Sequence, residues 1–410
     1  MAHPASGEAK VCAHAPARHA QEERSDMAHQ EAPERWPACL MYLTAYILPL
    51  TLLISFYVVP MFTVMYAYGL VPAMDWLVGN DDLVAPLHQA HDSRQELDNR
   101  GRALYYRLVI WLWVPTHVAL LMWALHQCRA TQTSIASLAM LGVCMGFLGA
   151  GSINVSHELF HKSNAYERAM ARLLLVLVCY GHFEVEHTMG HHKNVGTPAD
   201  PATAKLGQPF FSFLPQSVLG GLRSAWTLER ARVSRLRGSA RSSWSPLFEN
   251  RCVNAALGSS LVFLWVLAVY GLRGAAFFLL QAIVSVIILE KTNYIEHYGL
   301  ERTPVEGSSE SATPKYEPVQ PHHSWDAPQK VSNYMLFKLQ RHADHHLHAQ
   351  KQYYCLQLNQ CAPQLPAGYP ALAVLVMCPP IWRAVMDPLV LKARSQRSQQ
   401  GHVSSCRKTQ

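Results

Sequence analysis

Four short segments of this 410-residue chain carry histidines at spacings that suit metal binding. They read SHELFHK at 156–162, EHTMGHH at 186–192, NYIEHYG at 293–299 and LQRHADHH at 339–346. Histidines four residues apart lie on one helix face at neighbouring turns, so a pair such as His157 and His161 can hold one ion. Neutral imidazole is a ligand for iron, zinc or copper. These segments therefore predict a metal centre.

The number of clustered histidines indicates more than one ion. The chain has 22 histidines, and nine of them fall in the four segments. Nine exceeds what one ion can coordinate, and a His-His doublet either adds a third ligand or serves a second ion. Two ions fit the count. The predicted ligands are His157, His161, His187, His191, His192, His297, His342, His345 and His346.

Two zinc-based alternatives stay open at this point. HELFH at 157–161 matches the HExxH pattern of zinc proteases, in which Glu158 would activate water, but this reading leaves the other seven clustered histidines without a role. A zinc transporter would bind its cargo near the middle of the bilayer, on ligands within the spans. Only His117 lies well inside a predicted span, and we expect a neighbouring helix to satisfy it.

Membrane-spanning helices are the elements that must position these histidines. Half of the residues are hydrophobic and only 15% are charged, against about 25% charged in an ordinary soluble domain. Charge-free apolar runs approach or exceed the roughly 20 residues that a span needs. The pattern predicts an all-α bundle of six transmembrane helices. Two spans are expected within 38–79, with a turn near Pro60, and the others at 108–127, 134–153, 253–270 and 275–289.

The predicted spans place all four histidine segments on one side of the membrane. Two spans separate the first two segments from the last two, and the apolar run 170–179 is too short to cross. Six arginines between 223 and 241 make that side cytoplasmic by the positive-inside rule. Val218, Leu222 and Trp226 among them favour a helix lying in the membrane plane on anionic lipid, rather than a nucleic-acid site.

The remainder of the chain is expected to form one membrane domain with two tails. We predict a disordered extension at 1–35, because it is polar, mixes both charge signs and lacks a signal-peptide pattern. The membrane domain is expected over 36–390, and a basic disordered tail over 391–410. The ten cysteines include no CxxC pair, so we expect neither a disulfide framework nor an iron–sulfur domain fused to this chain.

Taken together, the four segments resemble those of the integral-membrane alkane 1-monooxygenases, a branch of the fatty-acid desaturase/hydroxylase superfamily. That family shows HELxHK, EHxxGHH, NYxEHYG and LQRHxDHH, and all four stand here in this order without a departure at the histidines. Flanking residues agree, as in YGHF at 180–183 and TPADPA at 197–202. The resemblance covers roughly residues 38–390.

This resemblance implies a six-helix bundle with a cytoplasmic cap, in which the nine histidines hold two iron ions. It implies hydroxylation of the terminal carbon of n-alkanes, with O2 as co-substrate and electrons from an external rubredoxin. It also implies a multi-pass protein of the plasma membrane in a bacterium, or of the endoplasmic reticulum in a eukaryote.

A related enzyme class stays open. An ω-hydroxylase, or another oxidase or desaturase, of fatty acids or fatty acyl lipids would use the same irons. It would add a polar contact for the head group at the far end of the substrate site. By sequence, Arg129 and Arg273 are the only obvious candidates for that contact.

Carboxylates beside the histidine segments are candidates for orienting the ligands through their second ring nitrogen. Alternatively, some of them cap helices or pair with nearby lysine and arginine side chains. The five candidates are Glu158, Glu186, Asp200, Glu296 and Asp344.

Other histidines and several small residues are given structural roles. His182 is expected to pack beside the second segment, and His348 and the doublet His322-His323 are expected at the surface. Small residues in the fourth span either let helices approach closely or leave room for an aliphatic chain that enters from the membrane. These residues are Gly142, Gly146, Gly149, Ala150 and Gly151.

Overall fold

A computed structural model describes residues 38–81, 103–239, 248–305 and 314–408, so the predicted extension 1–35 lies outside the described residues. Within these ranges the chain is helical, with isolated bridges in place of strands, which confirms the all-α prediction. In chain order the helices are η3 (Ala38–Tyr46), α1 (Ile47–Tyr57), α2 (Phe62–Met65), η4 (Tyr66–Leu70), α3 (Val71–Val78), α5 (Trp113–Arg129), α6 (Ile135–Phe160), α7 (Ala165–Leu177), α8 (Phe183–Val185), η5 (Glu186–His191), α9 (His192–Asn194), α10 (Phe210–Ser239), α11 (Arg251–His297), η6 (Pro321–His323), α12 (Lys330–Met335), α13 (His342–Leu347), η7 (Tyr353–Cys355), α14 (Tyr369–Leu375) and α15 (Pro379–Lys408).

Among the described residues, four helical stretches are long and apolar enough to cross a membrane, which indicates a membrane protein. They are Cys39–Tyr57, Ala103–Arg129, Ile135–Phe160 and Arg251–His297. The last stretch bends at Gly271, whose φ of 67° lies in the left-handed region that favours glycine. A shorter apolar helix, Phe62–Val78, follows a turn next to Pro60. The count of six crossings stays a prediction.

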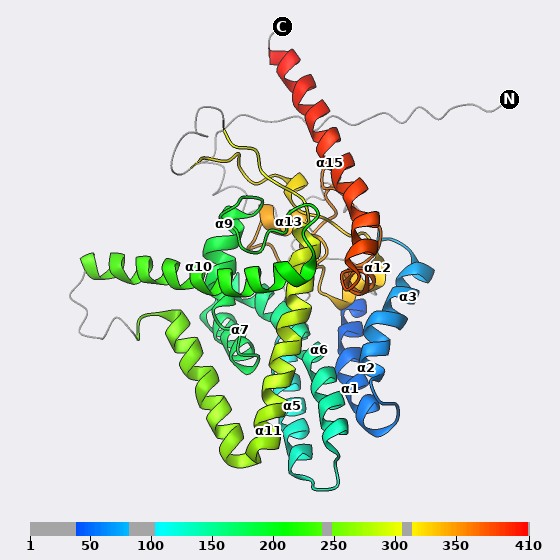
Figure 1. Ribbon diagram of the computed structural model, residues 1–410, viewed down its shortest axis with the longest axis vertical. Helices are drawn as coiled ribbons and strands as arrows, with labels where there is room; N and C mark the ends of the chain where they lie inside the picture. Colours follow the sequence, from blue (N-terminus) through cyan, green and yellow to red (C-terminus); the bar gives the residue numbers. More distant parts are fainter. Residues whose placement is uncertain (1–37, 82–102, 240–247, 306–313, 409–410) are drawn as a thin grey trace, which may run out of the picture.

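Helices α5, α6 and α11 form the centre of the bundle, where Figure 1 shows them side by side. A Cβ atom on Gly146 would clash with Val284, and one on Gly149 would clash with Ser285. Ser285 Oγ also donates a hydrogen bond to the backbone oxygen of Gly146 at 3.1 Å. The small residues therefore let α6 and α11 approach closely, which is one of the two roles expected for them.

Helix α10 crosses the long helices (Figure 1), and it has one packed face and one exposed face. One face packs on α8, η5 and α11. A second face is exposed and apolar, with Leu219, Leu222 and Trp226 among its residues. Arg223 and Arg230 lie on this same exposed face, because they are four residues from Leu219 and Trp226 respectively. An exposed face that combines apolar and basic residues is typical of a helix that lies in the membrane interface.

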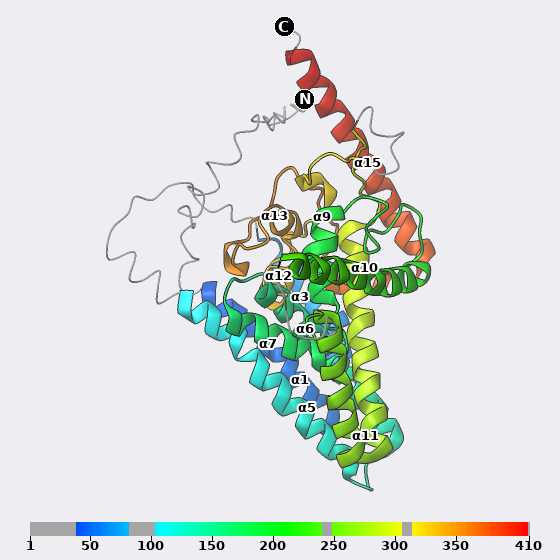
Figure 2. The same cartoon turned by 90° about the vertical axis from the view of Figure 1, so that its left-hand side faces the viewer.

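The short helices gather at one end of the bundle. Figure 2 shows α9 and α13 there, beyond the level at which α10 crosses, and α12 at about that level. A buried ion cluster ties this region to the residues after α3, because Asp81 Oδ2 lies 2.7 Å from Lys338 Nζ and 3.2 Å from an Arg341 guanidinium nitrogen. Arg341 directly precedes His342, so the cluster holds the start of α13 in place.

At the carboxyl end, the structure differs from the expected disordered tail at 391–410. Helix α15 continues to Lys408. Arg394 donates to the backbone oxygen of Gly299 at 2.7 Å, and Arg397 donates to that of Glu301 at 2.8 Å. These long side chains anchor the helix on the loop after α11. A basic composition predicts a solvated tail only where no tertiary partner is present.

Candidate metal centre

All nine predicted ligand histidines converge at the end of the bundle where the short helices gather. His157 and His161 lie at the carboxyl end of α6, and His297 is the last residue of α11. The second segment supplies its histidines from η5 and the start of α9, and the fourth segment from α13. Two long helices, α6 and α11, thus carry candidate ligands at their carboxyl ends. The short helices η5, α9 and α13 supply the other histidines of the cluster.

The histidine nitrogens form two groups, in each of which the candidate ligand atoms lie within 4.8 Å of one another. Rings of the two groups are also in contact, as His192 and His346 have centroids 4.6 Å apart. The first group is His157, His161, His187, His192 and His345, and the second is His191, His297, His342 and His346.

The grouping differs from what the four-residue spacing predicts, which is that histidines four residues apart hold the same ion. His187 and His191 are four residues apart but belong to different groups, whereas His187 and His192 share one. The reason is that 186–191 forms a π-helix, in which residues five apart come into register. In α13, His342 and His346 share a group across a regular turn, and His345 points to the other.

Distances between the nitrogens fit metal coordination. In the first group, His187 Nε2 lies 2.9 Å from His157 Nε2 and 3.0 Å from His192 Nε2. In the second group, His342 Nε2 lies 3.0 Å from both His297 Nε2 and His346 Nε2. Two nitrogens that each lie about 2.1 Å from one ion stand about 3 Å apart when the angle between them is near 90°. Each group therefore has the dimensions of a coordination sphere.

The protonation states also suit ligands. Burial holds the pKa of His187, His192 and His345 well below the ordinary value, so these imidazoles are neutral. His191 differs: burial disfavours its charged form, but the Asp200 carboxylate outweighs burial and raises the pKa of His191 to about 9, so this ring would release a proton on binding a metal ion. Neutral rings that aim several Nε2 atoms at one point cannot satisfy one another, since each has a single proton to share. A cation at that point resolves the conflict.

One of the five candidate carboxylates hydrogen-bonds to a candidate ligand histidine, and a second lies near one. Asp200 Oδ2 accepts from His191 Nδ1 at 2.9 Å, which leaves Nε2 of that ring to face the group. Thr203 was not anticipated, and its hydroxyl donates to the same Asp200 oxygen at 2.6 Å. Glu296 Oε1 lies 3.4 Å from His342 Nδ1, but neither atom makes a hydrogen bond among the described residues. The Asp200 contact is of the kind that orients a metal ligand.

The other three carboxylates have other partners or none. Glu158 pairs with Lys162 at 2.8 Å, and Asp344 pairs with Lys351 and His348 at 2.9 Å each. One Glu186 oxygen is buried without a hydrogen-bond partner in the described part of the chain. Burial, with Asp200 nearby, raises the pKa of Glu186 to about 8, so it is largely protonated at neutral pH.

The histidines outside the two groups mostly follow expectation, with one correction. His117 Nδ1 lies 2.5 Å from Ser152 Oγ on α6, so a neighbouring helix satisfies this nitrogen as expected, whereas Nε2 has no hydrogen-bond partner among the described residues. His348 is largely exposed. His323, expected at the surface, is fully buried, and its backbone oxygen lies 3.5 Å from His297 Nδ1. Its proline-rich surroundings predict a loop, but not that this loop folds down over the ligands.

An apolar cavity of about 150 Å³ adjoins both histidine groups. His157 and His187 line it from the first group, and His342 lines it from the second. It extends between α6, α11 and η4, and its wall includes Ala150 and Gly151, so these small residues take the second of the two expected roles. The cavity thus connects the candidate metal centre with the interior of the helix bundle.

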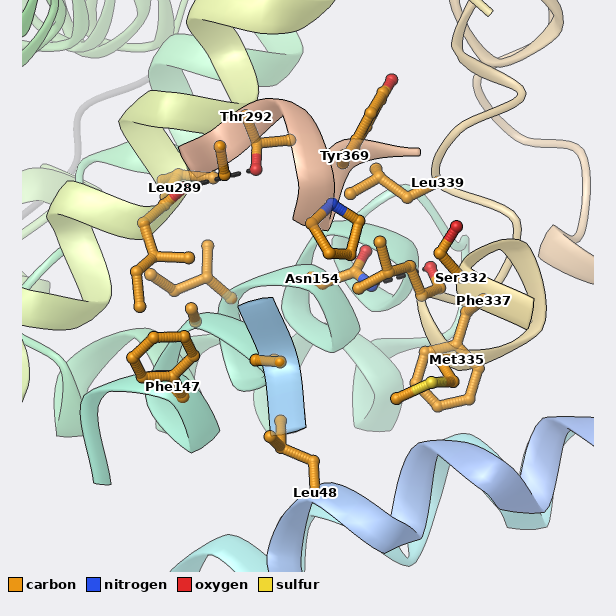
Figure 3. A pocket seen from close by; sticks show the side chains of 18 of the residues that line it. Leu48, Phe147, Asn154, Leu289, Thr292, Ser332, Met335, Phe337, Leu339 and Tyr369 are labelled. Carbon is orange, nitrogen blue, oxygen red and sulfur yellow. Dashed lines mark hydrogen bonds between the residues drawn. The ribbon is translucent and has the colours of Figure 1, made fainter. Parts of the chain in front are cut away.

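Asn154 and Thr292, two polar residues in the cavity wall, are hydrogen-bonded to the protein itself, whereas the Tyr68 hydroxyl in the same wall has no hydrogen-bond partner among the described residues. Figure 3 shows Asn154 and Thr292 among apolar side chains such as Leu48, Phe147 and Leu289. Asn154 Nδ2 donates to the backbone oxygen of Leu336 at 2.8 Å, and Thr292 Oγ1 donates to that of Ile288 at 3.3 Å. These groups are therefore already satisfied, and the surface that they leave suits an aliphatic chain.

Comparison with known proteins gives a consistent picture. The fatty acid desaturase family profile matches residues 133–375. Alkane 1-monooxygenase 2 of Pseudomonas aeruginosa is 37% identical over 340 residues, which cover 81% of this chain and 84% of that protein. Alkane 1-monooxygenase of Pseudomonas putida is 36% identical over 324 residues, 79% of this chain and 76% of that protein.

A more distant relative has a different substrate in its name. The hydroxylase component of xylene/toluene monooxygenase of Pseudomonas putida is 27% identical over 273 residues, 64% of this chain and 65% of that protein. The family resemblance seen in the histidine segments is confirmed: the chain belongs to the fatty acid desaturase family and, within it, to the alkane 1-monooxygenases.

Proposed function

We propose that this protein hydroxylates the terminal carbon of n-alkanes, using O2 and electrons from rubredoxin, at two iron ions held by the nine histidines. The observation that carries the proposal is the pair of adjoining histidine groups at one end of an apolar cavity. Neither group contains a carboxylate, and imidazole ligands suit iron. The relatives named alkane 1-monooxygenase support the choice of substrate class.

The proposed reaction balances with one O2 per turnover. A terminal C–H bond becomes C–OH, one oxygen atom enters the alcohol, and the other leaves as water with two protons and two electrons. Iron supplies the oxidising power that no amino-acid side chain has. The chain's own residues bind the alkane in the cavity and exclude water from it. Asp200 holds His191 in the orientation that coordination requires.

We propose that the histidine cap faces the cytoplasm, in the plasma membrane if the source is bacterial. The arginines on α10 support this orientation by the positive-inside rule. A cytoplasmic cap would be accessible to a soluble electron carrier such as rubredoxin, whereas an alkane would enter from the lipid.

Product analysis tests the proposal directly. The purified protein, supplied with reduced rubredoxin and O2, is given octane, hexadecane or palmitate. We expect 1-alkanols from the alkanes and about two irons per chain by metal analysis. Alkenes or internal alcohols as the main products would contradict terminal hydroxylation. Zinc as the only bound metal would contradict the iron assignment.

The ligand assignment is tested by a matched pair of histidine variants. His345→Ala removes a member of the first group, and we expect it to abolish turnover and to lower iron content, because a ring that faces the ion is lost. His348→Ala changes a largely exposed histidine three residues away and serves as the control. Both variants should remain membrane-inserted. Full activity of His345→Ala would contradict the assignment.

A further inference from the structure

A second, more polar cleft of about 850 Å³ lies beside α10 and is separate from the apolar cavity. Pro215, Gln216 and Gly220 of α10 form one wall of this cleft. The opposite wall comes from 196–205, the segment that follows α9, and from 301–304 after α11. None of the residues that line it is a histidine. The proposed reaction therefore leaves the α10 cleft without a ligand.

Three cationic side chains line the α10 cleft, and none of them forms an ion pair within the described ranges. The side chains of Lys205 and Arg223 are exposed and have no hydrogen bond to any described residue. Arg302 donates to the backbone oxygens of Glu317 at 2.7 Å and Lys193 at 2.8 Å. These bonds fix its guanidinium group but bring no negative charge to it.

The two carboxylates in the lining have cationic partners of their own. Asp200 is buried and accepts from His191 at 2.9 Å, and Glu301 lies 3.3 Å from a guanidinium nitrogen of Arg394. Neither carboxylate offsets the charge of the three cations. A cleft whose uncompensated charges have one sign attracts ligands of the opposite sign. The α10 cleft is thus suited to an anion.

An apolar strip leads away from the cleft along the exposed face of α10. Leu219 lines the cleft itself and is 54% exposed, and Leu222 and Trp226 continue the strip at intervals of three and four residues. A small soluble anion would gain nothing from these side chains. A lipid has both an anionic head and apolar tails, and α10 has the mixed basic and apolar face of a helix in the membrane interface.

We propose that the α10 cleft binds the phosphate head group of an anionic phospholipid such as phosphatidylglycerol, with an acyl chain along Leu219, Leu222 and Trp226. Arg223 and Lys205 would donate charge-assisted hydrogen bonds to the phosphate oxygens. A zwitterionic lipid is disfavoured, because the three cations repel its ammonium group. This inference goes beyond the proposed function, since it depends neither on iron nor on the substrate that is hydroxylated.

Lipid binding to the full-length protein in an uncharged detergent tests the inference. We expect phosphatidylglycerol to bind more tightly than phosphatidylcholine and to raise the thermal unfolding midpoint further. Arg223→Gln should weaken phosphatidylglycerol binding roughly tenfold, because a charge-assisted hydrogen bond is lost. Lys205→Gln should change it in the same direction. Arg230→Gln is the matched control: it removes the same charge from the same exposed face of α10, but Arg230 does not line the cleft.

Four outcomes would overturn the inference. The first is equal binding of the two lipids, and the second is equal weakening by Arg223→Gln and Arg230→Gln, which would show diffuse attraction to the helix. The third is inorganic phosphate binding as tightly as phosphatidylglycerol, since the acyl chain would then contribute nothing. The fourth is a higher KM for rubredoxin in Arg223→Gln with lipid binding unchanged, which would make the cleft a docking surface for an acidic protein.

The same protein separates this inference from the proposed function. Phosphatidylglycerol binding that depends on Arg223 and Lys205, in a protein that does not hydroxylate octane, would support the lipid site and contradict the proposed function. Octane hydroxylation without selective lipid binding would do the reverse.

Discussion

Asp200 illustrates how one side chain prepares a ligand. Its Oδ2 accepts from His191 Nδ1 and from the Thr203 hydroxyl, and its Oδ1 accepts from the backbone N–H of Ala202 at 3.1 Å. Three donors hold the carboxylate, so it can fix both the tautomer and the rotation of the ring. Asp344 is another buried carboxylate beside the site, but it binds Lys351 and His348 instead.

We therefore predict different results for the same substitution at these two positions. Asp200→Asn should lower iron affinity or turnover about 10- to 100-fold, because His191 loses its carboxylate partner. Asp344→Asn should have a smaller effect on metal content, since it contacts no ligand of either group. Iron analysis and octane turnover of the two proteins give the comparison. Equal losses in both variants would show that Asp200 has no special relation to His191.

The packing of helices α6 and α11 determines where the histidines at their carboxyl ends lie. Each carries a ligand histidine near its carboxyl end, so their separation sets the distance between the two histidine groups. Gly146 brings the two backbones together, and Ser285 bridges them through a hydrogen bond. Close packing of small residues takes the place of hydrophobic attraction between helices in a lipid environment.

We predict that Gly146→Ala destabilises the fold. The added methyl group would overlap Val284 and force the helices apart, at a cost of about 1–3 kcal/mol. Gly69→Ala is the matched control, because nothing lies within 4 Å of the corresponding position. Thermal unfolding midpoints of the two variants in the same detergent measure the difference. A midpoint for Gly146→Ala as high as that of the control would contradict the packing argument.

At the scale of the whole molecule, a buried ion cluster joins segments that are far apart in the chain. Asp81 follows the apolar helix 62–78, and its partners Lys338 and Arg341 precede α13. Burial disfavours the charged Asp81 carboxylate, but Lys338 and Arg341 outweigh it and lower the pKa of Asp81 below its ordinary 3.8. Asp81 therefore stabilises the folded protein above that value, and the stabilisation is lost as the pH falls through the folded-state pKa.

We predict that Asp81→Asn costs about 3–5 kcal/mol near neutral pH, because two buried cations lose their carboxylate. The variant should also lose less stability than the parent when the pH is lowered towards the pKa of a free carboxyl group. Unfolding midpoints over a pH series provide the test. Glu301→Gln, at an exposed carboxylate, is the control and should change little. A parent-like midpoint and pH profile for Asp81→Asn would contradict the structural role of the cluster.

The nine histidines as candidate metal ligands, the all-helical membrane class and the family could be predicted from the sequence alone, because these depend on residue type and local spacing. Only the tertiary structure decided which histidines share a group, since the π-helix at 186–191 changes the register that a regular helix predicts. It also decided that Asp200 hydrogen-bonds to a candidate ligand while Glu158 and Asp344 pair with lysine side chains. The two histidine groups join residues from different segments, and their formation depends on how the helices pack rather than on any pattern along the chain.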